Sequence, residues 1–179
     1  FVLIYYHLSK HFLNYDELLD IQKEYENKIN LLHLDEKTTL NSKQSKLLLH
    51  YLIASLYTLH APLRLDWAGL KIVSKKSEMT DDKQNYLLNQ GKFTKYVYLN
   101  DFKNVKSIGK QNFKLDKKLS LIINLYKKFN KGSELLQNSR GQNMTKNSLG
   151  KVIKQTFQKG DKSVNLNLIR KSKVKENLD

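Results

Sequence analysis

Two segments of the sequence place cationic side chains where the neighbouring chain can hold them rigidly. In LYTLHAPLRLDWAGLKI (56–72), a nearly continuous apolar stretch runs into a turn that presents Arg64. In YVYLNDFKNVKSIGK (96–110), Lys103 and Lys106 follow an alternating strand pattern and lie in or beside a predicted β-hairpin. A guanidinium on a rigid turn can donate paired hydrogen bonds to a phosphate or a carboxylate, and an ammonium adds a point charge. These positions therefore suit chemistry at an anionic group.

A third cation, Arg170, lies near the end of the sequence. It comes one helical turn after Asn167 in NLNLIRKS (165–172), a segment that resembles the start of a helix. Simpler roles stay open for these cations. Arg64 could pair with Asp66 or cap the preceding helix, and Arg170 could belong to a solvated basic tail.

The charge of the chain is uneven along the sequence. There are 32 Lys and Arg residues against 17 Asp and Glu, a net charge of +15. Residues 1–89 hold 11 basic and 11 acidic residues, so the whole excess lies in residues 90–179, with 21 basic and 6 acidic residues. Such an excess attracts a polyanion, with a log–log salt slope of about 0.9 per phosphate neutralised. A lysine-rich compositional bias is the alternative, but it would have affected both halves. The pattern therefore predicts contact with nucleic acid.

The composition excludes several classes of protein. At 40% apolar and 27% charged residues, the chain is typical of a globular protein rather than a disordered one. No apolar run approaches the length of a membrane-spanning helix, so we expect no membrane partner. The absence of Cys excludes disulfides, thiolate zinc sites and Cys nucleophiles, and fits a reducing, intracellular location. The opening FVLIYYHL lacks a basic leader and a cleavage site, so we expect an internal part of a protein rather than a secretory signal.

Hydrophobic periodicity predicts a mainly α fold with a small antiparallel β-sheet or hairpin. Four residues can act as N-caps of the expected helices: Asn14, Ser42, Asp116 and Thr145. The helix after Ser42 is apolar nearly all round, which is typical of a central core helix, and it should end near Pro62. Three segments are expected strands: 70–73, 95–99 and 110–115. Gly109 is the expected turn residue before the last of them.

The order of these features resembles the tyrosine recombinase (phage-type integrase) family, in which an arginine follows a core helix, a lysine lies on a hairpin and a second arginine opens a late helix. The similarity is greatest to the integrase-like recombinases of large DNA viruses and virophages. It is carried by LYTLHAPLRLDW, by the FK-containing hairpin with its following glycine, and by LLQNSRGQNMTKNSLGKVIKQTF (135–157), and it runs from about Tyr15 to the end. It implies a helical segment or linker in residues 1–41 and a catalytic-like domain, incomplete at its C-terminus, in residues 42–179.

By this resemblance, Arg64, Lys103 and Arg170 are the expected catalytic residues. The two guanidiniums would bracket the nonbridging oxygens of the reacting phosphate, and removing one such donor typically costs about 2.7–4 kcal/mol of transition-state stabilisation. Lys103 would act as the general acid toward the leaving 5′-oxygen, with Lys106 as its competitor for that role. A tyrosine would attack phosphorus to give a 3′-phosphotyrosyl intermediate, and no metal or nucleotide cofactor would be needed.

The sequence departs from the family pattern at three points. Asn167 stands where the family usually has a His, and an amide can hydrogen-bond a phosphate but cannot transfer protons. Trp67 stands three residues after the first arginine, where an acidic residue is common, and Asp66 comes one position early. No tyrosine follows Tyr126, so we expect the nucleophile to lie outside this chain, in a missing tail or another subunit.

The resemblance implies site-specific DNA recombination or integration, with double-stranded DNA as the partner and a homo-oligomer assembled on it. The location would be intracellular, in the nucleus or cytoplasm of a host cell. The chain by itself should bind DNA without cutting it. The alternative is a noncatalytic DNA- or RNA-binding protein that retains the fold. Accessory roles are expected for Asn167, Lys106 and His60. The expected DNA contacts are Lys110, Lys146, Lys151, Lys171 and Lys173.

Overall fold

The computed structural model describes residues 11–60, 63–167 and 169, which form two compact units. The first unit comprises the chain up to Arg64 and from Gly150 onward, and the second comprises Leu65–Leu149. Helices and one four-stranded sheet make up the described structure, so the general expectation of helices with a small sheet is confirmed. The predicted boundary at residue 41 falls between two helices that both belong to the first unit, and the functional division at that point stays a prediction.

Helix α2 (Tyr15–Leu31) begins where the sequence predicted. The Asn14 side chain accepts a hydrogen bond from the Glu17 backbone N–H at 2.9 Å, and the Glu17 carboxylate accepts one from the Asn14 N–H at 2.9 Å. This reciprocal capping box satisfies two backbone donors that the first turn of a helix leaves without partners.

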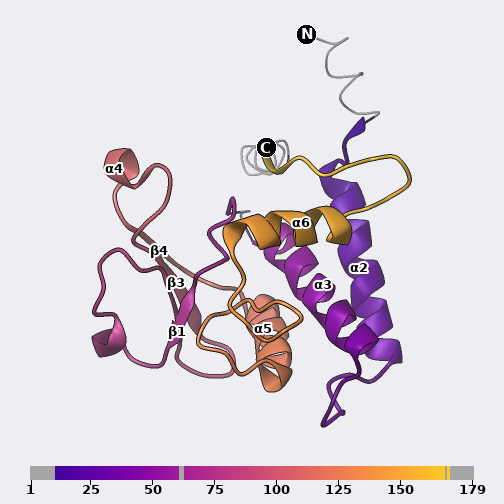
Figure 1. Ribbon diagram of the computed structural model, residues 1–179, viewed down its shortest axis with the longest axis horizontal. Coiled ribbons are helices and arrows are strands. Elements are labelled where there is room, and N and C mark those ends of the chain that lie inside the picture. The colour runs from indigo at the N-terminus through magenta and orange to yellow at the C-terminus, as the bar shows by residue number, and fades with distance from the viewer. Residues whose placement is uncertain (1–10, 61–62, 168, 170–179) are drawn as a thin grey trace. The chain divides into compact units, whose positions relative to one another are not determined.

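Helix α3 (Ser42–Thr58) is the buried central helix that the sequence predicted. Its cap is Asn41 rather than the expected Ser42, because the Asn41 side chain accepts from the Gln44 N–H at 2.9 Å while the Gln44 side chain accepts from the Asn41 N–H at 3.1 Å. Every residue from His50 to Thr58 is buried. Helices α2 and α3 pack side by side within the first unit (Figure 1).

A buried polar contact joins α2 and α3 to the C-terminal end of α6 (Lys146–Thr156). His50 Nδ1 lies 2.7 Å from Thr156 Oγ1, and that hydroxyl donates its single proton to the Val152 carbonyl at 2.8 Å. The Thr156 oxygen must therefore accept from His50, which fixes the neutral ring as the tautomer protonated on Nδ1. The Tyr25 ring stacks on His50, and its hydroxyl donates to the Thr156 carbonyl at 3.1 Å. The three helices thus meet at one hydrogen-bonded cluster.

This cluster makes the stability of the fold depend on pH. Burial, together with the charge of Lys46, lowers the pKa of His50 to about 4. Because the unfolded ring binds a proton from about pH 6.5 downward, the free energy of unfolding falls between about pH 6.5 and pH 4 and is independent of His50 above that window. Between about pH 7.5 and pH 5, the free energy of unfolding of wild type should fall by about 1–2 kcal/mol more than that of His50→Gln, measured by urea unfolding.

The matched control for this measurement is His33→Asn. His33 is exposed, lies 3.6 Å from Glu36, and has a positive φ of 48° that Asn tolerates. The His33→Asn protein should still show the loss of unfolding free energy between about pH 7.5 and pH 5 that His50→Gln removes. The same pH dependence in wild type and in His50→Gln would contradict the role of the buried ring.

The second unit contains a mixed four-stranded sheet in the order β1–β2–β3–β4. Its strands are β1 (Lys71–Val73), β2 (Tyr86–Asn89), β3 (Lys95–Leu99) and β4 (Gln111–Lys114). The predicted strands are confirmed, but the expectation of an antiparallel sheet is wrong in one pair, since β1 and β2 run parallel. The parallel partner of β1 is β2, a strand that the sequence did not predict. The connection between the two strands is long enough for the chain to return and run in the same direction. It contains a 3₁₀ turn, Lys76–Glu78.

Helix α5 (Lys117–Phe129) completes the second unit. Its predicted cap is confirmed, since the Asp116 carboxylate accepts from the Leu119 N–H at 2.7 Å. The Thr145 cap of α6 is confirmed too, because its hydroxyl accepts from the Ser148 N–H at 3.1 Å. The buried face of α5 carries Leu119, Ile122, Ile123 and Tyr126. Over the described ranges, no helix combines the length and the apolar character that crossing a membrane requires.

Candidate nucleic-acid interface

Positive charge is concentrated in the second unit. Residues 65–149 hold 17 basic and 7 acidic residues, an excess of ten. Within it, the segment from the β2–β3 turn to the first turn of α5 carries only two acidic residues, Asp101 and Asp116. Its exposed lysines are Lys92, Lys103, Lys106, Lys110, Lys114, Lys117 and Lys118. A surface of this charge suits a polyanionic partner.

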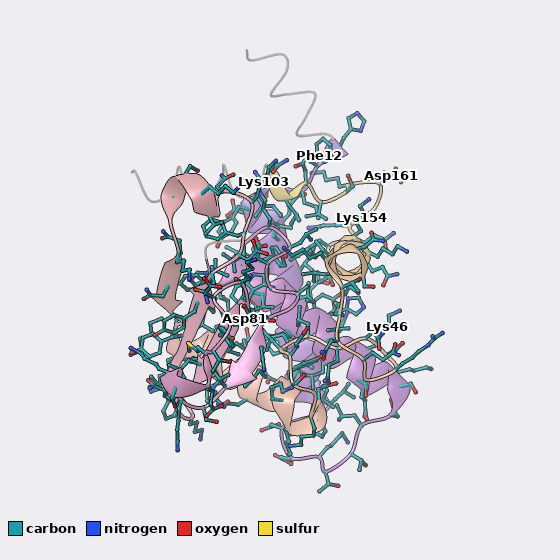
Figure 2. The ribbon with its side chains drawn as sticks, turned by 60° about the vertical axis from the view of Figure 1, so that its left-hand side comes forward. Phe12, Lys46, Asp81, Lys103, Lys154 and Asp161 are labelled. Atoms are coloured by element: carbon teal, nitrogen blue, oxygen red, sulfur yellow. The ribbon has the colours of Figure 1, made fainter. Side chains whose placement is uncertain are left out.

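Lys103 and Lys106 lie in the connection between the antiparallel strands β3 and β4, and Figure 2 labels Lys103 there. Lys103 occupies the turn before α4 (Val105–Ile108), Lys106 lies within that short helix, and both side chains are exposed. Gly109 ends α4 with a φ of 81°, a conformation that favours glycine and lets the chain turn into β4. The hairpin prediction is thus confirmed, while the chemical roles of the two lysines stay predictions.

A buried asparagine holds the base of this connection. The Asn85 side chain accepts from the backbone N–H groups of Asn100 and Asp101, both at 2.8 Å, and donates to the Asp101 carbonyl at 2.7 Å. These three bonds fix the chain two residues before Lys103. Asn85 is a positioning residue that the sequence analysis missed, because its three bonds depend on the pairing of β2 with β3.

Arg64 follows α3 as expected and is half-buried. Its backbone carbonyl accepts a hydrogen bond from the hydroxyl of Tyr57, a fully buried residue of α3. The core helix therefore anchors the turn that carries the guanidinium. His60, two residues after the last residue of α3, is half-buried. Arg64 and Lys103 belong to different units and Arg170 lies outside the described residues, so the gathering of the three cations around one phosphate stays a prediction.

Two of the predicted DNA-contacting lysines have carboxylate partners. Lys146 lies 2.9 Å from Asp66, whose side chain is 14% exposed, and Lys110 lies 3.8 Å from the exposed carboxylate of Asp82. The Asp66 partner is therefore Lys146, whereas the sequence had suggested Arg64 as one candidate. Exposed pairs such as Lys110 with Asp82 contribute little to stability. A phosphate could still contact either lysine, but it would have to compete with the carboxylate that the lysine already contacts.

The remaining predicted contacts are distributed between α6 and the end of the chain. Lys151 is exposed on α6. Asn167 is exposed in the last helical turn of the described structure, and its backbone N–H donates to the Asn165 side chain at 3.0 Å. Lys171 and Lys173 lie outside the described residues.

The Lys146 pair supports a specific prediction about DNA affinity. Asp66→Asn should release the Lys146 ammonium and tighten duplex DNA binding about two- to threefold at fixed salt, measured by fluorescence anisotropy. Glu78→Gln is the matched control, because it removes an exposed negative charge elsewhere in the same unit. In a Lys146→Met background, Asp66→Asn should have no more effect than Glu78→Gln. Equal effects of Asp66→Asn and Glu78→Gln in the wild-type background would contradict the competition.

Five of the tyrosines that the structure describes have structural environments. Tyr15 and Tyr25 donate to backbone carbonyls in the first unit, and Tyr86 accepts from a backbone N–H in the second. Burial raises the pKa of Tyr126 to about 12. The pKa of Tyr51 is also raised, mainly by burial and to a smaller extent by the charge of Glu26. A nucleophile needs an accessible phenolate, and the burial of Tyr51 and Tyr126 disfavours one at these two residues. The expectation that the nucleophile lies outside this chain stays a prediction.

Lys95, the first residue of β3, is a buried lysine that the sequence analysis did not single out. It is 1% exposed, on the inner face of β3, and its ammonium donates to Asn89 Oδ1 and to the Gly91 carbonyl, both at 2.9 Å. Burial lowers its pKa. Lys95 thereby closes the β2–β3 turn, which carries the exposed ring of Phe93.

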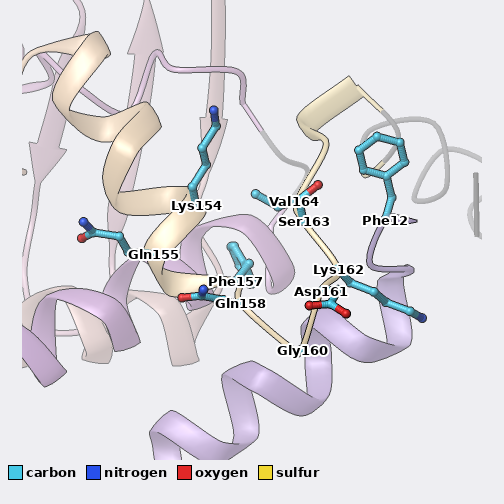
Figure 3. A pocket seen from close by; sticks show the side chains of 10 residues that line it. All are labelled: Phe12, Lys154, Gln155, Phe157, Gln158, Gly160, Asp161, Lys162, Ser163 and Val164. Carbon is cyan, nitrogen blue, oxygen red and sulfur yellow. The ribbon is translucent and has the colours of Figure 1, made fainter. Parts of the chain in front are cut away.

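A cavity of about 590 Å³ lies in the first unit, beside the end of α6 (Figure 3). It contains none of the predicted site residues. Lys162, on its lining, pairs with Glu17 at 2.7 Å, and Asp161 adds a carboxylate. The lining therefore does not concentrate positive charge, unlike the surface of the second unit.

Within residues 11–60, 63–167 and 169, no three His, Cys, Asp or Glu side chains come together as a set of metal ligands. Comparison with protein-family models, with curated proteins and with solved structures found no match for this chain. Function is therefore inferred from the residues and the geometry described above.

Proposed function

We propose that this chain is part of a tyrosine-type DNA recombinase that binds duplex DNA through its lysine-rich second unit. The observation that carries this proposal is the position of Lys103 and Lys106. Both are exposed on a hairpin connection, and Asn85 holds the base of that connection through hydrogen bonds to its backbone. The unit that presents them has an excess of ten positive charges. A positioned lysine on a basic surface suits both DNA binding and chemistry at a phosphodiester.

The proposed reaction needs only side chains. Arg64 and Arg170 would bracket the nonbridging oxygens of the scissile phosphate and stabilise the charge of the transition state. A tyrosine hydroxyl from outside this chain would lose its proton to bulk water and attack phosphorus, while the bond from phosphorus to the 5′-oxygen breaks. Lys103 would donate a proton to that leaving oxygen. The tyrosyl ester keeps the phosphate activated, so a second 5′-hydroxyl can reverse the step and rejoin the strands.

The second candidate is a noncatalytic DNA- or RNA-binding protein with the same fold. Asn167 favours it, because an amide replaces the proton-transferring His that the family usually has before the second arginine. Both candidates require salt-sensitive binding to nucleic acid. They differ in chemistry, since only the recombinase forms a covalent protein–DNA intermediate.

The test of binding is the salt dependence of duplex DNA affinity. We expect log K to fall linearly with log salt, and Lys103→Ala or Lys106→Ala to reduce the slope by about 0.9 each. Lys23→Ala is the matched control, because Lys23 is exposed on α2 beside Asp20 and Glu24, and it should leave the slope unchanged. Binding that does not depend on salt, or the same slope in all variants, would contradict the proposal.

A further inference from the structure

We propose that the β2–β3 turn binds an unpaired nucleotide of DNA, with Phe93 stacking on the base and Lys92 and Lys117 contacting the neighbouring phosphates. This inference rests on the proposed function, since it assumes that DNA is the partner. It adds a second ligand, a single-stranded segment, and a second surface, separate in sequence from the connection that carries Lys103.

The Phe93 ring has the exposure and the charge environment that such a site needs. It is 43% exposed and is the one aromatic among the large exposed apolar side chains of the described residues. The Lys117 ammonium lies 4.7 Å from the ring centroid, and that of Lys92 lies 5.4 Å from it. Within the described residues, neither ammonium forms an ion pair with a carboxylate. Both lysines can therefore turn to phosphates when a base takes their place on the ring.

The turn that presents Phe93 is held rigidly. From inside the unit, the buried Lys95 ammonium bonds to Asn89 and to Gly91. From α5, the Asn124 side chain donates to the Lys92 carbonyl at 2.7 Å. Burying a lysine costs free energy unless its donors are satisfied, so these contacts have to form for the turn to keep this shape. A ring fixed in this way loses little conformational entropy when it stacks on a base.

The charge around the ring favours an anionic strand over an uncharged partner. Lys117 is the first residue of α5, where the peptide dipoles add partial positive charge. The nearby Asp116 carboxylate is directed to the helix cap, where it accepts from the Leu119 N–H. Exposed Lys114 and Lys118 flank this point in the sequence. An aromatic ring among cations is the arrangement by which proteins bind single strands without reading their sequence.

The experiment compares Phe93→Leu with wild type on a fluorescent single-stranded oligothymidine and on a duplex of the same length. Leucine keeps the apolar bulk but has no aromatic face. We expect single-strand affinity to fall about tenfold and duplex affinity to change by less than about twofold. Phe93→Tyr should retain single-strand binding. Phe129→Leu is the matched control, because that ring lies under Lys128 at the other end of α5, and it should leave both affinities unchanged.

Each outcome separates this inference from the proposed function. Duplex binding without single-strand binding in wild type would overturn the inference and leave the proposed function intact. Single-strand binding without duplex binding would overturn the proposed function and leave the inference intact. If wild type binds neither the single strand nor the duplex, both the inference and the proposed function are overturned. Equal losses on the two ligands in a Phe93→Leu protein with unchanged melting temperature would overturn the stacking role. Tighter binding of single-stranded RNA than of DNA would overturn the assignment to DNA.

Discussion

Replacing Lys103 with alanine should slow formation of the covalent protein–DNA intermediate by about 10²–10³-fold while duplex affinity falls less than about threefold. The reason is that the 5′-oxygen leaves as an alkoxide unless a proton reaches it in the transition state. One phosphate contact among many contributes far less to binding. The measurement is the single-turnover rate of adduct formation, with the proposed tyrosine supplied by a further segment or by another subunit.

Three further variants and one substrate identify the role of this lysine. Lys103→Arg should keep DNA affinity without restoring the rate, because a guanidinium does not release its proton. A substrate with sulfur in place of the leaving 5′-oxygen should restore the rate of Lys103→Ala, since a thiolate leaves without protonation. Lys110→Ala, in the same connection, should react as wild type does. Full activity in Lys103→Ala together with loss in Lys106→Ala would assign the role to Lys106 instead.

The second large effect concerns the stability of the second unit. Trp67→Ala should lower its free energy of unfolding by about 3–5 kcal/mol, because the indole is fully buried and its removal leaves a large cavity. Trp67 is the only Trp in the sequence, so its fluorescence reports on this unit in wild type. For the variant, urea unfolding is followed by far-UV circular dichroism.

Two comparisons make this result specific. Trp67→Phe should cost clearly less than Trp67→Ala, because it keeps most of the apolar contact. Leu31→Ala, at a side chain that is 78% exposed in the first unit, should change stability by less than about 0.5 kcal/mol. A loss below about 1 kcal/mol in Trp67→Ala would contradict the structural role of this residue, which occupies a position where the resembled family commonly has an acidic residue.

Local signals predicted the helix starts well, because a cap depends on residues only a few positions apart. Asn14, Asp116 and Thr145 each accept from a backbone N–H three residues later, as their types suggested. The exception is instructive. Asn41 and Gln44 form a reciprocal capping box, and both residue types could be read from the sequence. The sequence analysis nevertheless chose the neighbouring Ser42 as the cap.

Features that depend on distant pairing could not be predicted in the same way. Strand β2 was missed because YLLN has no alternation of apolar and polar residues, and its parallel partner β1 lies across a long connection. Alternation in β3 does place Lys95 on the same face as Val97 and Leu99. What the sequence does not show is that Asn89 and Gly91 supply the acceptors that allow this lysine to be buried.

The same distinction applies to the candidate site. The hairpin that carries Lys103 followed from strand patterning around a glycine, and the turn that carries Arg64 followed from the apolar helix before it. Two other features arise only when the chain has folded. They are the hydrogen bonds of Asn85 to the base of the hairpin connection and the pairing of Lys146 with Asp66 across 80 positions.

The most direct measurement is covalent trapping on a nicked duplex whose cleaved fragment diffuses away, so that rejoining cannot occur. With the proposed tyrosine supplied by a further segment or by another subunit, the recombinase assignment predicts a DNA-linked protein band resistant to denaturation, with the 3′-phosphate attached to that tyrosine. The band should be lost in Arg64→Ala and in Arg170→Ala although both still bind the duplex. Tight, salt-sensitive binding of the duplex by the wild-type protein, with that tyrosine supplied and no covalent band, would contradict the assignment and leave a noncatalytic nucleic-acid-binding protein.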